Sequence, residues 1–184
     1  MPLSTKFQEL VDLITQNREK LFASVSGLND EQLNHKSEGS VWSICDVLNH
    51  VALTDEANAK LTSNILKRAR SETLSSDPSP DHSELNSIDP ILEKMRVGKF
   101  QAPDFVNPRA HASVDESFAK LKHSRERMLE NIRQLDGLDL YGLTHPHPFA
   151  GPLNAYQWIL IAGAHESRHV AQIERMKSAT DFPK

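Results

Sequence analysis

His165-Glu166-Ser167-Arg168-His169-Val170-Ala171-Gln172 contains two histidines four residues apart. On an α-helix, residues four apart lie one above the other, so both imidazoles face the same way. Apolar residues continue that stripe in steps of three and four, which predicts that the histidines point into the core. These apolar residues are Trp158, Ala162, Ile173 and Met176.

Two buried imidazoles need polar partners, because burying a polar group without a hydrogen bond costs about 1–3 kcal/mol. Two interpretations are open. The pair could be core histidines that bond to the backbone or to neighbouring side chains, or it could be half of a metal site. The pair alone supports both equally, and a third ligand would favour the metal.

Length and composition indicate one ordinary globular domain, residues 1–184. The chain is 38% hydrophobic and 25% charged, which is typical of such domains. It carries 21 basic and 25 acidic residues, for a net charge of −4. Since no basic block is present, neither nucleic acid nor an anionic membrane is expected as a partner.

The first residues lack the apolar segment of a signal peptide, and no run reaches the roughly 20 apolar residues of a membrane helix. We therefore expect a cytoplasmic protein. Cys45 is the single cysteine, so an internal disulfide and a thiolate metal site are both excluded. Any metal must be held by His, Asp or Glu side chains.

Four segments show the apolar spacing of long amphipathic helices. The first begins near Phe7 and stops at Gly27, and the second runs from Ser43 towards Arg70. The third and fourth occupy residues 113–137 and the segment after Asn154. Capping boxes open the last three. No segment is a convincing strand, so the sequence predicts an all-α four-helix bundle.

Residues 71–112 break the helical period with several prolines and form a long irregular connection between the second and third helices. Within it, Asp89-Pro90 predicts the start of a short helix, because proline is favoured at the first helical position.

His50 lies beside the apolar seam of the second helix and is the obvious third ligand for His165 and His169. A single histidine in such a position is more often a partly buried residue with a hydrogen-bond partner than a metal ligand. Asp46, one turn earlier, is its expected hydrogen-bond partner, and Gln172 is a candidate to orient an imidazole of the fourth helix.

The other histidines have less favourable positions. His82, His111 and His123 lie outside the apolar stripes and are expected to face solvent. His147 is expected to cap its proline-rich loop rather than border a pocket.

Three neutral imidazoles from facing helices leave a fourth coordination position open, as in catalytic rather than structural zinc sites. Because the three imidazoles are neutral, they do not balance the charge of a divalent ion. The open position should therefore favour an anion such as hydroxide, thiolate or carboxylate. The metal would lower the pKa of a bound water or thiol towards neutrality. Zinc or nickel suits imidazole ligands.

His165 to His169 also matches H-E-x-x-H, the metalloprotease pattern in which the glutamate is the general base. Glu166 is therefore a weak catalytic candidate. Three features argue against a protease: the short segment after His169, the lack of a distant glutamate ligand and the lack of a strand to bind peptide. We favour a solvated or salt-bridged role for Glu166.

Several motifs resemble the DinB-like superfamily of damage-inducible and YfiT-type proteins. They are Trp42-Ser43 before the His50 helix, the run from His147 to Leu153, Trp158, and His165 with Arg168-His169 and Gln172-Ile173. The resemblance covers nearly the whole chain and is strongest over its last forty residues. Glu166 departs from it, because that position varies in the family.

This resemblance implies a four-helix bundle with a long crossover between helices two and three, and frequently a homodimer. It also implies one divalent metal ion on His50, His165 and His169. Members with assigned activity are mainly transferases or isomerases that use a low-molecular-weight thiol, while YfiT-type members are described as metal-dependent hydrolases.

The sequence thus predicts a metal-dependent enzyme that activates a thiol or water for attack on a small electrophilic substrate. The alternative is a metal- or ligand-binding stress-response protein without turnover, which the lack of an unambiguous general base supports. A third interpretation, three core histidines without metal, requires three coincidental buried imidazoles.

Overall fold

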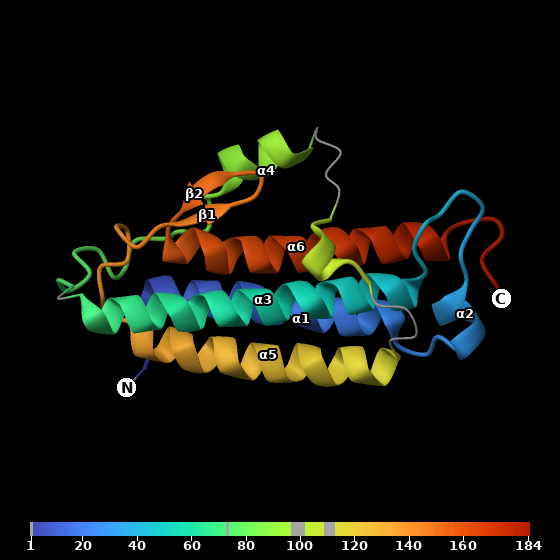
Figure 1. Cartoon of the computed structure of the whole chain (residues 1–184), viewed down its shortest axis with the longest axis horizontal. Coiled ribbons are helices and arrows are strands. Elements are labelled where there is room, and N and C mark those ends of the chain that lie inside the picture. Colours follow the sequence, from blue (N-terminus) through green and yellow to red (C-terminus); the bar gives the residue numbers. More distant parts are fainter. Residues whose placement is uncertain (1, 73, 97–101, 109–112) are drawn as a thin grey trace.

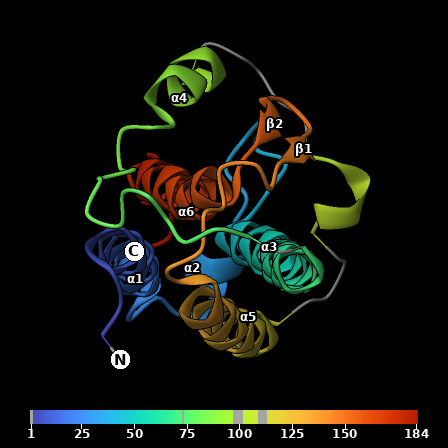
Figure 2. The ribbon, with the colours of Figure 1, turned by 90° about the vertical axis from the view of Figure 1, so that its left-hand side faces the viewer.

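The computed structural model of the chain describes residues 2–72, 74–96, 102–108 and 113–184. In that part of the chain, four long helices lie side by side and form a bundle (Figure 1), which confirms the predicted fold. Viewed from one end, α6 neighbours both α1 and α3, and α5 lies against α3 (Figure 2). The bounds are α1 (Thr5–Val25), α3 (Ile44–Ser71), α5 (Val114–Leu135) and α6 (Ala155–Lys177).

The long helices begin where their capping residues predict. α3, α5 and α6 each open with a capping box, in which the side chain before the helix and the third helical side chain satisfy each other's free N–H groups. The pairs are Ser43 with Asp46, Ser113 with Glu116, and Asn154 with Gln157. Within the described residues, no helix combines the length and apolar character needed to cross a bilayer.

Smaller elements join the long helices, and not all were predicted. The short helix at Asp89-Pro90 is confirmed as α4 (Asp89–Arg96). α2 (Asp30–Asn34) lies between the first two predicted helices, and the 3₁₀ turn η1 (Asp104–Val106) lies in the connection expected to be irregular.

The expectation of no strand is wrong for one hairpin, β1 (His145–His147) with β2 (Gly151–Leu153). Both strands have three residues, and Pro146 pairs opposite Pro152. Strands this short and rich in proline lack the alternation by which a strand is recognised in a sequence. The hairpin and α4 lie over α6 (Figure 1).

The apolar core is divided into two halves. One half joins the beginnings of α1 and α6 to the ends of α3 and α5, and the other fills the opposite end of the bundle. Between them lies a buried set of charged side chains, which we call the ionic layer. It consists of Arg18, Asp55, Arg125 and Glu166.

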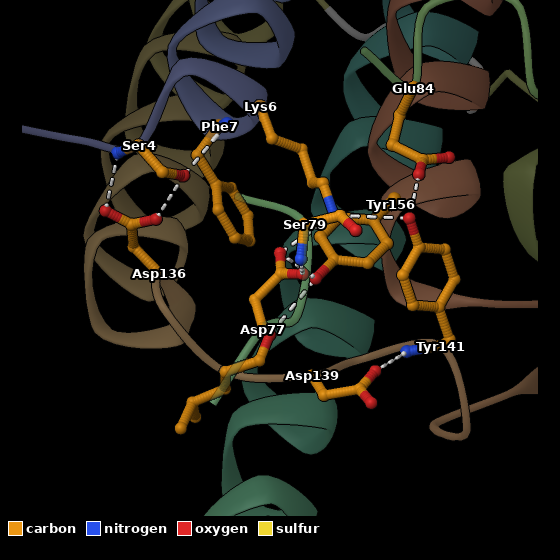
Figure 3. A network of polar contacts seen from close by, with 11 residues as sticks. Ser4, Lys6, Phe7, Asp77, Ser79, Glu84, Asp136, Asp139, Tyr141 and Tyr156 are labelled. Carbon is orange, nitrogen blue, oxygen red and sulfur yellow. Dashed lines mark hydrogen bonds and ion pairs between the residues drawn. The ribbon is translucent and has the colours of Figure 1, made fainter. Parts of the chain in front are cut away.

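A second buried ion pair anchors the long connection to α1 (Figure 3). The fully buried Lys6 places its Nζ 2.8 Å from Asp77 Oδ2 and 3.2 Å from Tyr141 Oη. Its ammonium also lies over the rings of Tyr141 and Tyr156, 4.8 and 4.6 Å from their centroids. Burial opposes ionisation of Asp77, but hydrogen bonds from Lys6 and Ser79 outweigh it and lower the Asp77 pKa.

The Lys6–Asp77 pair gives a prediction about stability. Lys6→Met should lower the free energy of unfolding by about 3 kcal/mol, because it leaves Asp77 buried and unpaired. Lys6→Met with Asp77→Leu should recover most of that loss. Urea unfolding followed by circular dichroism measures both. Asp77→Leu alone completes the cycle, and a double variant whose loss equals the sum of the two single losses would show that the pair is not coupled.

Candidate metal centre

The three histidines singled out in the sequence lie together in the structure. His50 comes from α3, and His165 and His169 come from successive turns of α6. His165 Nε2 is 3.1 Å from the Nε2 atoms of both His50 and His169. All three ligand atoms lie within 4.8 Å of one another. Two nitrogens on one zinc-like ion cannot lie more than about 4.2 Å apart, twice the bond length, and the two 3.1 Å separations that involve His165 satisfy this limit.

Hydrogen bonds on the far side of two rings fix which nitrogen faces the cluster. His50 Nδ1 lies 2.8 Å from the Val106 carbonyl oxygen, and His169 Nδ1 lies 2.8 Å from Gln172 Oε1. Because these oxygens accept hydrogen bonds, both Nδ1 atoms carry the proton and both Nε2 atoms present a lone pair. Gln172 therefore occupies the orienting position expected from the sequence.

Asp46 does not orient an imidazole, and the expectation that it bonds to His50 is wrong. Its carboxylate accepts hydrogen bonds from Ser43 in the capping box and lies 2.9 Å from Lys36 Nζ. A carboxylate in the first turn is held by the free N–H groups there. The partner of His50 is a backbone carbonyl of η1, which the sequence did not indicate.

The electrostatic surroundings keep all three imidazoles neutral. Burial lowers the pKa of each, and the neighbouring rings lower it further for His165 and His169. The His169 pKa falls to about 4, and that of His165 lies well below its usual value. Neutral imidazole is the form that binds a metal.

The contacts among the rings also favour a cation. His165 Nε2 can donate one proton at most, and therefore to only one of its two neighbours. The other 3.1 Å contact would bring two lone pairs together. A positive ion among the three nitrogens removes this repulsion, so the donor set fits a divalent metal.

Aromatic side chains border the cluster. The ring centroid of Trp42 lies 4.9 Å from that of His50. His147 lies against Trp158, and its Nδ1 accepts hydrogen bonds from the backbone of Phe149 and Ala150, so it caps the hairpin turn as expected. It also lies close enough to His165 to contribute to the lowered pKa of that residue, so it borders the cluster as well. His165 keeps partial exposure.

Of the histidines expected to face solvent, two are described by the structure. His82 and His123 are exposed, as predicted. His111 lies outside the described residues.

Glu166, the weak catalytic candidate, faces away from the histidines into the ionic layer. Its Oε1 accepts hydrogen bonds from Arg18 (2.6 Å) and Arg125 (2.7 Å), and the residue is 1% exposed. Burial raises the Glu166 pKa, although the two arginines oppose the rise. A carboxylate held in this way is not placed to act as general base at the histidine cluster. The salt-bridged role preferred from the sequence is the one observed.

The arginines that hold Glu166 were missed in the sequence, although a signal was present. Arg18 follows Ile14 by four residues, and Arg125 follows Leu121 by four, so each lies on the apolar stripe of its helix. A long charged side chain at such a position is buried only when it is paired. Removing one partner of a buried pair typically costs about 3–5 kcal/mol.

The fold and the site together define a class of protein, a four-helix bundle whose facing helices carry a three-histidine candidate metal centre. The chain belongs to the DinB superfamily, whose family profile matches residues 13–173. The resemblance seen in its motifs is thereby confirmed.

Comparison with individual proteins agrees with this family. The chain is 28% identical to the uncharacterized protein YuaE of Bacillus subtilis (strain 168) over 169 residues, which cover 91% of this chain and 96% of YuaE. The fold is similar to that of TT2238, described as a four-helix bundle protein. That match has a TM-score of 0.61 and 21% sequence identity, and it covers 92% of this chain and 98% of TT2238.

The geometry predicts that His50→Ala and His169→Ala abolish metal binding, because two imidazoles hold a divalent ion much more weakly than three. Elemental analysis of tag-free protein should find about one equivalent of metal in the wild type and almost none in either variant. His123→Ala, which removes an exposed histidine of α5, is the matched control and should retain the metal. Wild-type protein that stays metal-free after incubation with zinc, nickel and manganese would contradict this prediction. It would support the interpretation of three core histidines without a metal.

Proposed function

We propose that this protein is a divalent-metal-dependent enzyme that activates a low-molecular-weight thiol or water for attack on a small electrophilic substrate. It would act as a thiol S-transferase or a hydrolase. The observation that carries the proposal is the convergence of three neutral imidazole nitrogens from α3 and α6. Membership of the DinB superfamily supports it.

When bound, a zinc- or nickel-like ion would lower the pKa of a thiol or water in its open position and supply a nucleophile near neutral pH. The protein's own contribution is to hold two of the imidazole ligands in the tautomer that binds a metal through Nε2. Val106 and Gln172 keep the Nδ1 protons of His50 and His169, so neither of these two imidazoles has to change tautomer when the site is filled. His165 is partly exposed, and thiol and substrate would approach the ion from that side.

One observation favours the alternative, a metal- or ligand-binding protein without turnover. Among the described residues, the candidate ligand group contains three histidines and no carboxylate. The nearby Glu166 is committed to two arginines. A general base at the cluster is therefore not evident, and an activity assay must separate the two functions.

The enzyme proposal predicts thiol-dependent or hydrolytic turnover of at least one small electrophile by metal-loaded protein. A panel of thiols and electrophiles is followed by substrate loss, and His165→Ala should reduce the rate about 100-fold or more, because the metal's contribution is several kcal/mol. His123→Ala serves as control and should retain full activity.

Two outcomes would contradict it. Equal activity in His165→Ala and wild type would place the reaction elsewhere in the protein. Absence of turnover across the panel, together with a rise in Tm when one of the panel compounds is added, would identify a binding protein instead.

A further inference from the structure

The ionic layer takes one charged side chain from each long helix. Arg18 belongs to α1, Asp55 to α3, Arg125 to α5 and Glu166 to α6. Their side chains are 7%, 3%, 9% and 1% exposed, and two positive charges balance two negative ones. On every helix the charged residue lies between the two apolar halves of the core. The layer therefore marks the same level on all four helices.

Glu166 is the centre of the layer. Its Oε1 lies 2.6 Å from Arg18 Nη2 and 2.7 Å from Arg125 Nη2. Arg18 Nη2 also lies 2.9 Å from Asp55 Oδ2. One carboxylate of α6 thus binds α1 and α5 directly and is linked to α3 through Arg18.

The two arginines also join α1 to α5. Arg18 Nη1 donates to the Leu121 carbonyl on α5 (2.6 Å), and Arg125 Nη1 donates to the Ile14 carbonyl on α1 (2.5 Å). These reciprocal bonds tie each guanidinium to the backbone of the opposite helix. The donors that meet Glu166 are consequently fixed in position before any metal is considered.

The layer and the histidine cluster lie on the same two helices. Glu166 directly follows His165, and successive helical residues point about 100° apart, so α6 presents its two sites on adjacent faces. Asp55 follows His50 on α3 by five residues. Each helix that supplies an imidazole is therefore also held by an acid of the ionic layer.

We propose that the ionic layer sets the rotation and axial register of α6 against α3, which makes Glu166 a positioning residue of the metal centre. The inference rests on the proposed metal site. If α6 slid by one residue, it would move about 1.5 Å along its axis. Apolar contacts tolerate such a shift, whereas the 2.6 Å charged hydrogen bond between Arg18 and Glu166 would be broken by it. The same slide would move His165 Nε2 away from its 3.1 Å separation from His50 Nε2.

The test compares two isosteric changes, each of which removes one buried carboxylate charge. Glu166→Gln alters the ionic layer, and the control Asp77→Asn alters the Lys6 pair, whose residues the candidate ligand group does not include. Three quantities are measured: stability to urea, zinc affinity by chelator competition, and the visible absorption spectrum of the Co²⁺-substituted protein. Both variants should lose stability.

Only Glu166→Gln should lose zinc affinity, by about 10-fold or more, as is usual when a residue that orients metal ligands is changed. Its Co²⁺ spectrum should also change, because the spectrum reports ligand geometry. Asp77→Asn should leave affinity and spectrum as in the wild type. A purely structural ionic layer would give two variants that differ from the wild type in stability alone.

A fourfold apolar replacement covers the case in which Glu166→Gln does not fold. Arg18→Met, Asp55→Leu, Arg125→Met and Glu166→Leu together remove every charge of the layer, and such replacements often keep or raise stability. This variant should fold as a helical bundle and still bind zinc more weakly. Wild-type affinity and spectrum in it would overturn the positioning role while leaving the metal site intact, whereas a wild type that binds no metal would overturn both proposals.

Discussion

Two guanidiniums, one from α1 and one from α5, close on a single carboxylate of α6 in the middle of the bundle, away from water. Charges buried this deeply are tolerated only when paired and hydrogen-bonded. The four helices must therefore meet at one level, with apolar side chains filling the space on either side. α6 is central to this arrangement, since one of its faces carries Glu166 and the adjacent face carries His165 and His169.

Much of the fold could be predicted from local sequence. Capping boxes and apolar spacing gave all four long helices, because both signals depend on residues close together in the chain. The three histidines could be grouped because His165 and His169 are four residues apart on one helix and His50 lies beside the apolar seam of another. The short hairpin was not predicted, because its strands contain exposed prolines and show no alternation of apolar and polar residues.

What could not be predicted depends on contacts between distant residues. Asp46 was a reasonable partner for His50 by spacing, yet its position in the first helical turn commits it to Ser43 and Lys36. The actual partner is the carbonyl of Val106, 56 residues from His50, and a backbone group has no sequence signature. Arg18 and Arg125 lie on the apolar stripes of their own helices, but their common partner Glu166 belongs to a third helix. Asp77 and Val106 are thus two of the points at which the long connection is joined to the bundle.

The order of the helices along the chain has a consequence for biogenesis. α6 comes after the other three long helices, and it alone supplies Glu166 and two of the three clustered imidazoles. Before it docks, Arg18 and Arg125 would have to compete for Asp55, and burying them would leave an excess positive charge in the core. Without α6, the two guanidiniums would therefore need water to stabilise their charge at the centre of the bundle. Docking of α6 would then supply the missing carboxylate and complete the histidine cluster in the same step.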